Sequence, residues 1–214
     1  MTQPRFPALY AILDPTLSPI PVTRLAAELA DAGVELIQLR DKRSSAAQIL
    51  AQARELAALL AAKNARFILN DRPDVAAMAG AGGVHVGQED LTVEDARRIV
   101  KSSLWVGVST HNLQQLRQAA ATSADYIAIG PVFPTSTKEN PDPVVGLDFV
   151  RAARQITDTP LVAIGGITLE TAGDVFRAGA DSVAIIRDLL AAGSPAERAR
   201  EYLSIAEKSR STRI

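Results

Sequence analysis

Eight short apolar runs alternate with helical patterns along this chain, and this alternation constrains the fold more than any other feature. The runs are rich in Val, Ile and Leu, which is typical of strands that helices cover on both faces. Strands are predicted at residues 9–13, 36–39, 66–69, 83–86, 105–108, 126–129, 161–164 and 182–185. Eight consecutive strand–helix units predict an α/β fold, the closed (β/α)8 TIM barrel with a parallel sheet.

Amphipathic segments between these runs predict the helices of the outer layer. They cover residues 22–32, 46–62, 73–79, 93–101, 112–121, 146–155, 169–178 and 188–207. An open doubly wound sheet is the alternative, but Asp14-Pro15-Thr16-Leu17 follows the first strand in place of a Gly-rich dinucleotide fingerprint. We therefore predict one barrel domain over 1–214, with 1–7 as an N-terminal extension and 207–214 as a frayed tail.

The charge and composition argue against several classes of function. The formal net charge of −1 provides no broad basic field for nucleic acid or an anionic membrane. The absence of cysteine removes disulfides, thiolate metal sites and cysteine nucleophiles. No apolar run approaches the roughly 20 residues that span a bilayer, and no signal-peptide region precedes the first strand. We expect a cytoplasmic protein that holds any anionic ligand through local groups.

The second predicted strand runs into a cluster of hydrogen-bond donors, Gln38-Leu39-Arg40-Asp41-Lys42. Strand alternation sends Gln38, Arg40 and Lys42 to one side and Leu39 to the other. Three donors, two of them cationic, suit an oxygen-rich anion. A solvated loop with chance alternation is the alternative interpretation.

Two acids follow the third and fourth predicted strands. Asp71 comes directly after Asn70 at the end of one strand, and Asp90 follows the next. Because the carboxyl ends of barrel strands share one rim, two carboxylates near phosphate-binding cations indicate a Mg2+ site. A structural role is the alternative, since Asp71 could cap the following helix. Ser109, at the end of the fifth strand, is a candidate donor to a substrate.

The segment after the sixth strand carries three hydroxyls and a lysine in consecutive positions, Thr135-Ser136-Thr137-Lys138. Pro131 and Pro134 prevent the strand from continuing into it, because proline lacks an amide donor. Short donors beside one point charge can wrap an anionic group. A solvated loop could carry the same residues.

Paired glycines follow the seventh strand, and an arginine follows the eighth. Gly165 and Gly166 let a backbone approach a ligand and offer bare amides to phosphate. Arg187 falls in the adjoining loop, and the last two loops of such barrels often bind phosphate. A simple tight turn would explain the glycines locally, but not their coincidence with Arg187.

Five segments together resemble the thiamine-phosphate synthase family over about Leu9 to Leu190: residues 38–42, 70–71, 84–90, 130–138 and 164–167. The resemblance implies a TIM-barrel transferase of thiamine biosynthesis. Its implied reaction is Mg2+-dependent transfer of the 4-amino-2-methylpyrimidine-5-methyl group from its diphosphate to the nitrogen of thiazole phosphate. Diphosphate leaves, thiamine phosphate forms, and no protein nucleophile is required.

The resemblance also implies residue roles. Those for the pyrimidine diphosphate are Gln38, Leu39, Arg40, Asp41, Lys42, Asn70, Ser109 and Lys138, of which Lys138, Arg40, Lys42 and Ser109 are the catalytic set. Those for the thiazole phosphate are Thr135, Ser136, Thr137, Gly165, Gly166, Ile186 and Arg187. Asp71 and Asp90 would hold Mg2+. Arg187 departs from the serine that the family often has, which puts a side-chain role there in doubt while a backbone amide contact would survive.

Three other functions are weighed against this one. The thiazole tautomerase paralogue uses a histidine general base where this chain has Pro131, which cannot move a proton. A catalytically silent regulator would have no need of Mg2+ carboxylates. An isomerase of a sugar phosphate or a tryptophan precursor needs an acid–base pair that we do not find outside the diphosphate cluster. We expect His85 to orient its loop, while the number of subunits, a homo-oligomer included, stays open.

Overall fold

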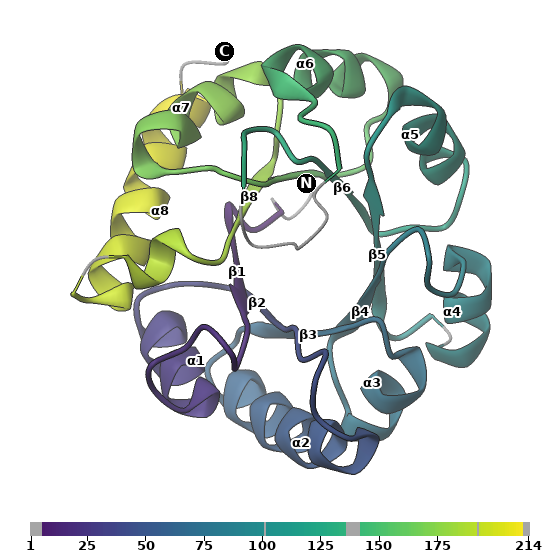
Figure 1. The fold of residues 1–214 in the computed structure, drawn as a ribbon, viewed down its shortest axis with the longest axis vertical. Helices are drawn as coiled ribbons and strands as arrows, with labels where there is room; N and C mark the ends of the chain where they lie inside the picture. The colour runs from purple at the N-terminus through teal and green to yellow at the C-terminus, as the bar shows by residue number, and fades with distance from the viewer. Residues whose placement is uncertain (1–5, 101, 136–141, 192, 212–214) are drawn as a thin grey trace.

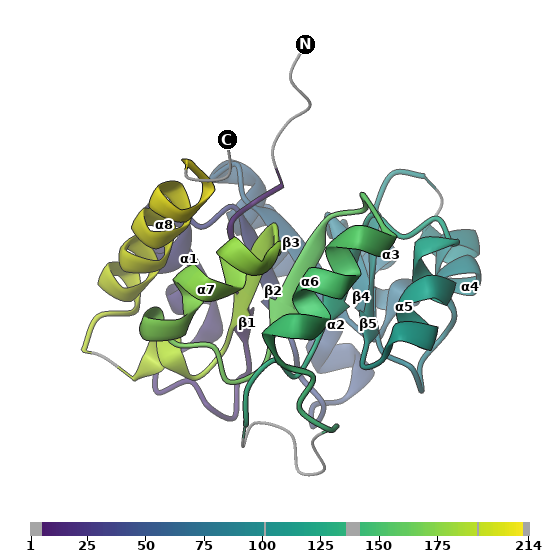
Figure 2. The ribbon, with the colours of Figure 1, turned by 90° about the horizontal axis from the view of Figure 1, so that it is seen from above.

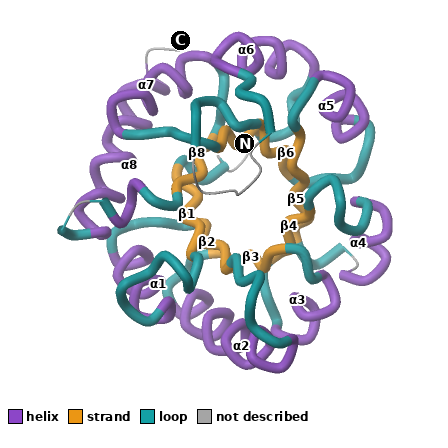
Figure 3. The backbone as a smooth tube through the Cα atoms, viewed as in Figure 1, coloured by secondary structure: helices purple, strands orange, loops and turns teal. Residues whose placement is uncertain are grey.

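The computed structural model describes residues 6–100, 102–135, 142–191 and 193–211. Eight parallel strands form a closed barrel in which each strand pairs with the next and β8 pairs with β1 (Figures 1 and 3). The strands are β1 Leu9–Leu13, β2 Leu36–Leu39, β3 Arg66–Asn70, β4 Gly83–Val86, β5 Trp105–Thr110, β6 Tyr126–Ile129, β7 Leu161–Ile164 and β8 Ser182–Ile185. The predicted (β/α)8 barrel is confirmed.

Helices surround the sheet on its outer side (Figure 1). They are α1 Val22–Asp31, α2 Ala46–Ala62, α3 Pro73–Ala79, α4 Val93–Val100, α5 Leu113–Ala120, α6 Gly146–Ile156, α7 Leu169–Ala178 and α8 Pro195–Ser211, with the short 3-10 helix η1 at Asp188–Leu190. Among the described helices none is long and apolar enough to cross a membrane.

The last predicted helix, 188–207, is wrong at both ends. Its first residues form η1, and α8 begins only at Pro195, where a missing amide hydrogen costs nothing in a first helical turn. The helix then continues to Ser211, although residues from 207 were predicted to fray. Packing holds this end, because Ser209 is buried and the Arg210 guanidinium donates to the Phe6 carbonyl at 3.4 Å.

Strand alternation divides the core into two layers. Side chains such as Leu39 and Leu69 pack against the helices in the outer layer. The inner layer fills the barrel with Tyr10, Ile12, Leu36, Ile68, Tyr126, Ala128, Val162 and Ala184. The barrel is therefore a packed core rather than a pore, and ligands can approach only at its two rims.

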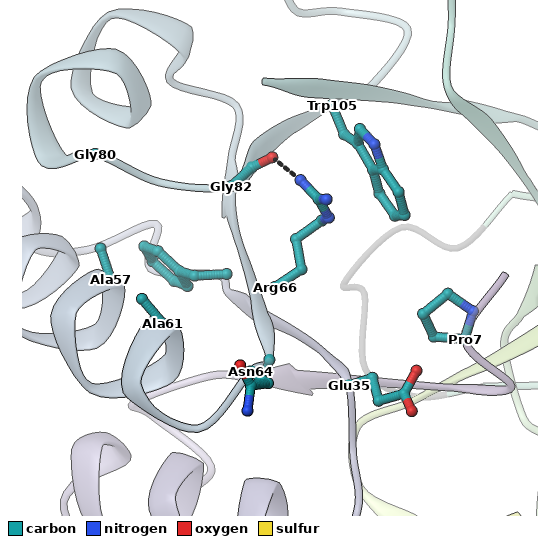
Figure 4. A pocket seen from close by; sticks show the side chains of 11 residues that line it. Pro7, Glu35, Ala57, Ala61, Asn64, Arg66, Gly80, Gly82 and Trp105 are labelled. Atoms are coloured by element: carbon teal, nitrogen blue, oxygen red, sulfur yellow. Dashed lines mark hydrogen bonds between the residues drawn. The ribbon is translucent and has the colours of Figure 1, made fainter. Parts of the chain in front are cut away.

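The amino-terminal rim is closed by stacked rings. Phe6 stacks on Trp105 with ring centroids 5.4 Å apart, and the Arg66 guanidinium lies 3.8 Å from the Trp105 centroid. Arg66 also donates to the Gly82 carbonyl at 2.9 Å (Figure 4). A cavity of about 420 Å³, lined in part by Arg66, Trp105 and Glu35, opens at this rim. Because barrel chemistry belongs to the opposite rim, we assign this end to stability.

Candidate active site

The carboxyl-terminal ends of the strands bring the predicted polar residues to one rim. Figure 2 shows the turns after β1 and β6 at the bottom of the barrel, opposite the N-terminus. Gln38, Asn70 and Ser109 occupy the same alternation phase as the inner-layer residues of their strands, since Leu36, Ile68 and Gly107 precede them by two. Their side chains therefore belong to the inner face of the sheet.

Arg40 is held by an acid that the sequence analysis did not single out. Its Nη1 lies 2.9 Å from Oδ2 of Asp14, a carboxylate that is 9% exposed. The other Asp14 oxygen accepts from the Thr16 amide at 2.9 Å and the Thr16 hydroxyl at 2.6 Å. The loop after β1 thus fixes the guanidinium at the rim. The sequence did contain a signal for Asp14, because this acid directly follows a predicted strand, as the other site residues do.

Asp71 and Asp90 come together, as their predicted rim position requires. Asp90 is close enough to act on the Asp71 carboxyl, and Nζ of Lys42 is 3.2 Å from Oδ2 of Asp71. Burial first, and then the neighbouring Asp90, raise the pKa of the Asp71 carboxyl, while Lys42 opposes this shift. The Asp71 and Asp90 carboxylates are therefore neighbours in a partly buried part of the rim.

The backbone around these acids is shaped to hold them. Asp71 adopts a φ of 64°, a left-handed conformation that few residues other than glycine tolerate without strain. Its amide donates to the His85 carbonyl at 2.8 Å, which ties the end of β3 to β4. Asp90 accepts from the Gly87 amide at 2.8 Å. The alternative role of Asp71 as a helix cap is not seen, because α3 has Arg72 at its N-cap without a side-chain bond.

A chain of buried hydrogen bonds crosses the barrel below the rim. Gln38 Nε2 donates to Tyr10 Oη at 2.6 Å, and the Tyr10 and Tyr126 hydroxyls are 2.8 Å apart. Tyr126 Oη lies 3.0 Å from His85 Nδ1, and His85 Nε2 lies 2.8 Å from Ser109 Oγ. Burial lowers the pKa of His85 to about 4, so the ring is neutral near pH 7. His85, predicted to orient its loop, joins two strands instead.

The loop after β6 (loop 6) and the loop after β7 (loop 7) are joined by backbone hydrogen bonds. The amides of Val132 and Phe133 donate to the carbonyls of Ile164 at 2.9 Å and Gly165 at 3.0 Å. Gly166 has a φ of 64°, and a Cβ there would lie 2.3 Å from the Pro134 carbonyl oxygen. Only glycine fits this approach, so the paired glycines are more than a tight turn. Thr135 follows this contact directly, whereas Ser136, Thr137 and Lys138 lie outside the described residues.

The turn after β8 is anchored from α8. Asp188, the first residue of η1, accepts from Arg198 Nε at 3.0 Å and Nη2 at 3.1 Å. The Tyr202 hydroxyl donates to the same carboxylate at 2.5 Å. Ile186 packs against the inner layer, and Arg187 stands exposed at the start of η1. The first residue of η1 is therefore tied to α8 by three hydrogen bonds.

Two residues predicted to bind substrate, Leu39 and Asp41, also have structural contacts. Leu39 is fully buried in the outer layer, so its side chain faces the helices and only its backbone is available to a ligand. Asp41 Oδ1 accepts from the amides of Arg43 at 2.9 Å and Ser44 at 3.0 Å, which closes the turn before α2.

Comparisons with known proteins agree with this geometry. The family model described as thiamine monophosphate synthase matches residues 9–189. A thiamine-phosphate synthase of Koribacter versatilis is 52% identical over 206 residues, which is 94% of this chain and 96% of the relative. One from Methanospirillum hungatei is 40% identical over 198 residues, covering 92% of this chain and 96% of the relative.

A solved structure gives the same result. The thiamine phosphate pyrophosphorylase of Pyrococcus furiosus superimposes with a TM-score of 0.86 at 32% identity, over 94% of this chain and 96% of that one. A 3-hexulose-6-phosphate synthase, at 20% identity and a TM-score of 0.67, shares the fold alone. The rim geometry and the whole-length matches lead to one conclusion: the chain belongs to the thiamine monophosphate synthase family of alkyl-group transferases.

Proposed function

We propose that this protein transfers the 4-amino-2-methylpyrimidine-5-methyl group, the whole pyrimidine ring with its methylene carbon, from its diphosphate to the nitrogen of thiazole phosphate, with Mg2+ as cofactor. Diphosphate and thiamine phosphate are the products. The observation that carries the proposal is the neighbouring carboxylates Asp71 and Asp90 with the Lys42 ammonium 3.2 Å from Asp71, and Arg40, paired with Asp14, follows the same strand as Lys42. Such a site suits a metal-bound diphosphate better than a neutral ligand.

The carboxylate pair fits Mg2+. Asp71 and Asp90 would supply oxygen ligands, and a divalent cation would favour the charged form of Asp71, whose pKa is raised first by burial and then by Asp90. Within the described residues no group of three acidic, His or Cys side chains forms a closed metal cage. Mg2+ commonly takes one or two carboxylates and fills its remaining positions with water and substrate phosphate. When bound, the ion would neutralise charge on the diphosphate.

The cations stabilise the leaving group. The bond between the pyrimidine methylene carbon and the diphosphate oxygen breaks, and its electron pair leaves with diphosphate. Arg40, fixed by Asp14, and Lys42 are placed to stabilise the growing negative charge, and Lys138 is proposed to join them. The thiazole nitrogen then supplies the electron pair for the new carbon–nitrogen bond. The electron pair that leaves with diphosphate is replaced at the methylene carbon by the pair from the thiazole nitrogen, so no protein nucleophile is required.

The loops after β7 and β8 would bind the thiazole phosphate. Gly165 and Gly166 offer amides without side chains, and η1 supplies the short extra helix that phosphate sites of barrels often use. Thr135, with Ser136 and Thr137 after it, adds hydroxyl donors from loop 6. Arg187 and Ile186 complete this end, where the backbone amide of Arg187 is the proposed contact.

An assay of diphosphate release tests this reaction. Purified protein is given both precursors with and without Mg2+, and product is expected only when all three are present. Asp71→Ala and Lys138→Ala should each lose at least about 100-fold in turnover while remaining folded. Matched controls are Asp148→Ala, whose side chain is 97% exposed on α6, and Lys63→Ala, which pairs with Asp31 away from the rim. Near wild-type turnover in either site variant would reject the assignment.

Calorimetry separates the metal from the rest of the proposal. Titration of the pyrimidine diphosphate should show tighter binding when Mg2+ is present, and Asp90→Asn should remove most of that difference. Binding that is indifferent to Mg2+ would take Asp71 and Asp90 out of the site. A silent regulator would bind the diphosphate yet release no product in the coupled assay.

A further inference from the structure

The buried hydrogen-bond chain below the rim has no branches among the described residues. Tyr10 and Tyr126 are 1% and 0% exposed, and each hydroxyl has two partners within the chain. In the described part of the protein no buried side-chain nitrogen or oxygen lacks a hydrogen-bond partner. Burial raises the pKa of both tyrosines, so both keep their protons. Each hydroxyl must therefore donate one hydrogen inside the chain.

The direction of the chain follows from its first member. Gln38 Nε2 carries hydrogens and no lone pair, so Tyr10 Oη accepts from it. The Tyr10 hydrogen then has one acceptor within reach, Tyr126 Oη at 2.8 Å. Tyr126 is left to donate to His85 Nδ1 at 3.0 Å. A neutral imidazole that accepts at Nδ1 carries its proton on Nε2, which donates to Ser109 Oγ at 2.8 Å.

The absence of a side chain at position 107 makes room for Tyr126 in the middle of this hydrogen-bond chain. A Cβ at Gly107 would lie 2.0 Å from Cζ of Tyr126 and 2.4 Å from its hydroxyl, so only glycine leaves room for the ring. Tyr126 also stacks on His85 with centroids 5.5 Å apart and meets the edge of Tyr10 at 5.7 Å. Glycine inside a strand weakens it, and here it creates the place for one phenol.

We propose that Tyr10, Tyr126 and His85 are positioning residues that fix which way Gln38 and Ser109 face the substrate. Within the described residues Gln38 Oε1 makes no hydrogen bond, so the amide presents an acceptor. Ser109 receives a hydrogen from His85, so its own hydroxyl hydrogen is available as a donor. An acceptor on β2 and a donor on β5 match the amine and a ring nitrogen of an aminopyrimidine. That last match rests on the proposed function, whereas the direction of the chain does not.

Nitrogen NMR of protein labelled with 15N-histidine tests the direction in the absence of substrate. In the wild type, Nδ1 of His85 should be unprotonated and Nε2 protonated. Gln38→Glu places only acceptors beside Tyr10, which reverses every donor in the chain and moves the proton of His85 to Nδ1. Tyr10→Phe removes the step that imposes direction and should give a mixture of tautomers. Tyr202→Phe, which removes a buried hydroxyl elsewhere, should leave the wild-type tautomer.

The outcomes distinguish this inference from the proposed function. A proton on Nδ1 in the wild type, or an unchanged tautomer in Gln38→Glu, would overturn the directed chain even if the enzyme releases diphosphate. The expected tautomers in a protein without synthase activity would support the chain and refute only its aminopyrimidine ligand. In an active enzyme, Tyr126→Phe should lower kcat/KM for the pyrimidine diphosphate about 10-fold and leave KM for the thiazole phosphate unchanged.

Discussion

The substitution Gly107→Ala puts the packing around Tyr126 to a quantitative test. The added Cβ would lie 2.0 Å from Cζ of Tyr126, about 1.4 Å short of the 3.4 Å at which ordinary contact begins. The ring is enclosed by Tyr10, His85 and Phe6, so it cannot withdraw without leaving one of its hydroxyl partners at 2.8 or 3.0 Å. Overpacking costs about 1–3 kcal/mol, and one buried hydroxyl left unpaired costs about as much again.

Taking about 3 kcal/mol from this range, the melting temperature should fall by about 6–12 °C, since a domain of this size loses about 2–4 °C per kcal/mol. Calorimetric unfolding of both proteins measures the shift. Gly193→Ala is the matched control, because a Cβ there has no atom within 4 Å. The His85 tautomer should also become mixed in Gly107→Ala. A melting temperature within about 2 °C of the wild type would refute the packing argument.

Three further predictions concern single residues. Because burial lowers the pKa of His85 to about 4, the folded protein resists protonation, and its unfolding free energy should fall by up to about 3 kcal/mol as the pH drops from 6.5 to 4. Urea midpoints across this range should fall less in His85→Gln. Gly166→Ala should raise KM for the thiazole phosphate at least about 10-fold in steady-state assays, since its Cβ would meet the Pro134 carbonyl at 2.3 Å. Asp14→Asn should weaken calorimetric binding of the pyrimidine diphosphate by about 1–2 kcal/mol, because Arg40 loses its charged anchor, and unchanged affinity would contradict that role.

The regular features of the fold could be predicted from the sequence because strand alternation and helical periodicity are local signals. The start of the last helix could not, because Leu189 and Leu190 continue an apolar pattern while the break lies in the Gly193-Ser194-Pro195 segment. The bounds of the strands, by contrast, were confirmed almost residue for residue, since every apolar run except the last, which is followed by Ile186, ends at a polar or glycine residue.

Within the site, residues at strand ends were accessible to sequence reasoning and residues inside strands were not. Asp71 and Asp90 stand out as acids after apolar runs. Tyr10 and Tyr126 lie within such runs, where an aromatic residue usually fills the core. Their pairing joins positions 116 apart in the chain, and only closure of the barrel brings them together.

In the turn after β8, the residue that anchors the backbone, Asp188, is a different one from the exposed residue at 187. Arg198 and Tyr202 hold the Asp188 carboxylate from α8, so the turn is anchored at the residue that follows Arg187. Exchange of serine for arginine can then occur at 187 while the main-chain amide stays in place. The carboxyl-terminal helix thereby supports this turn through Asp188, whatever charge the side chain at 187 offers to an incoming phosphate.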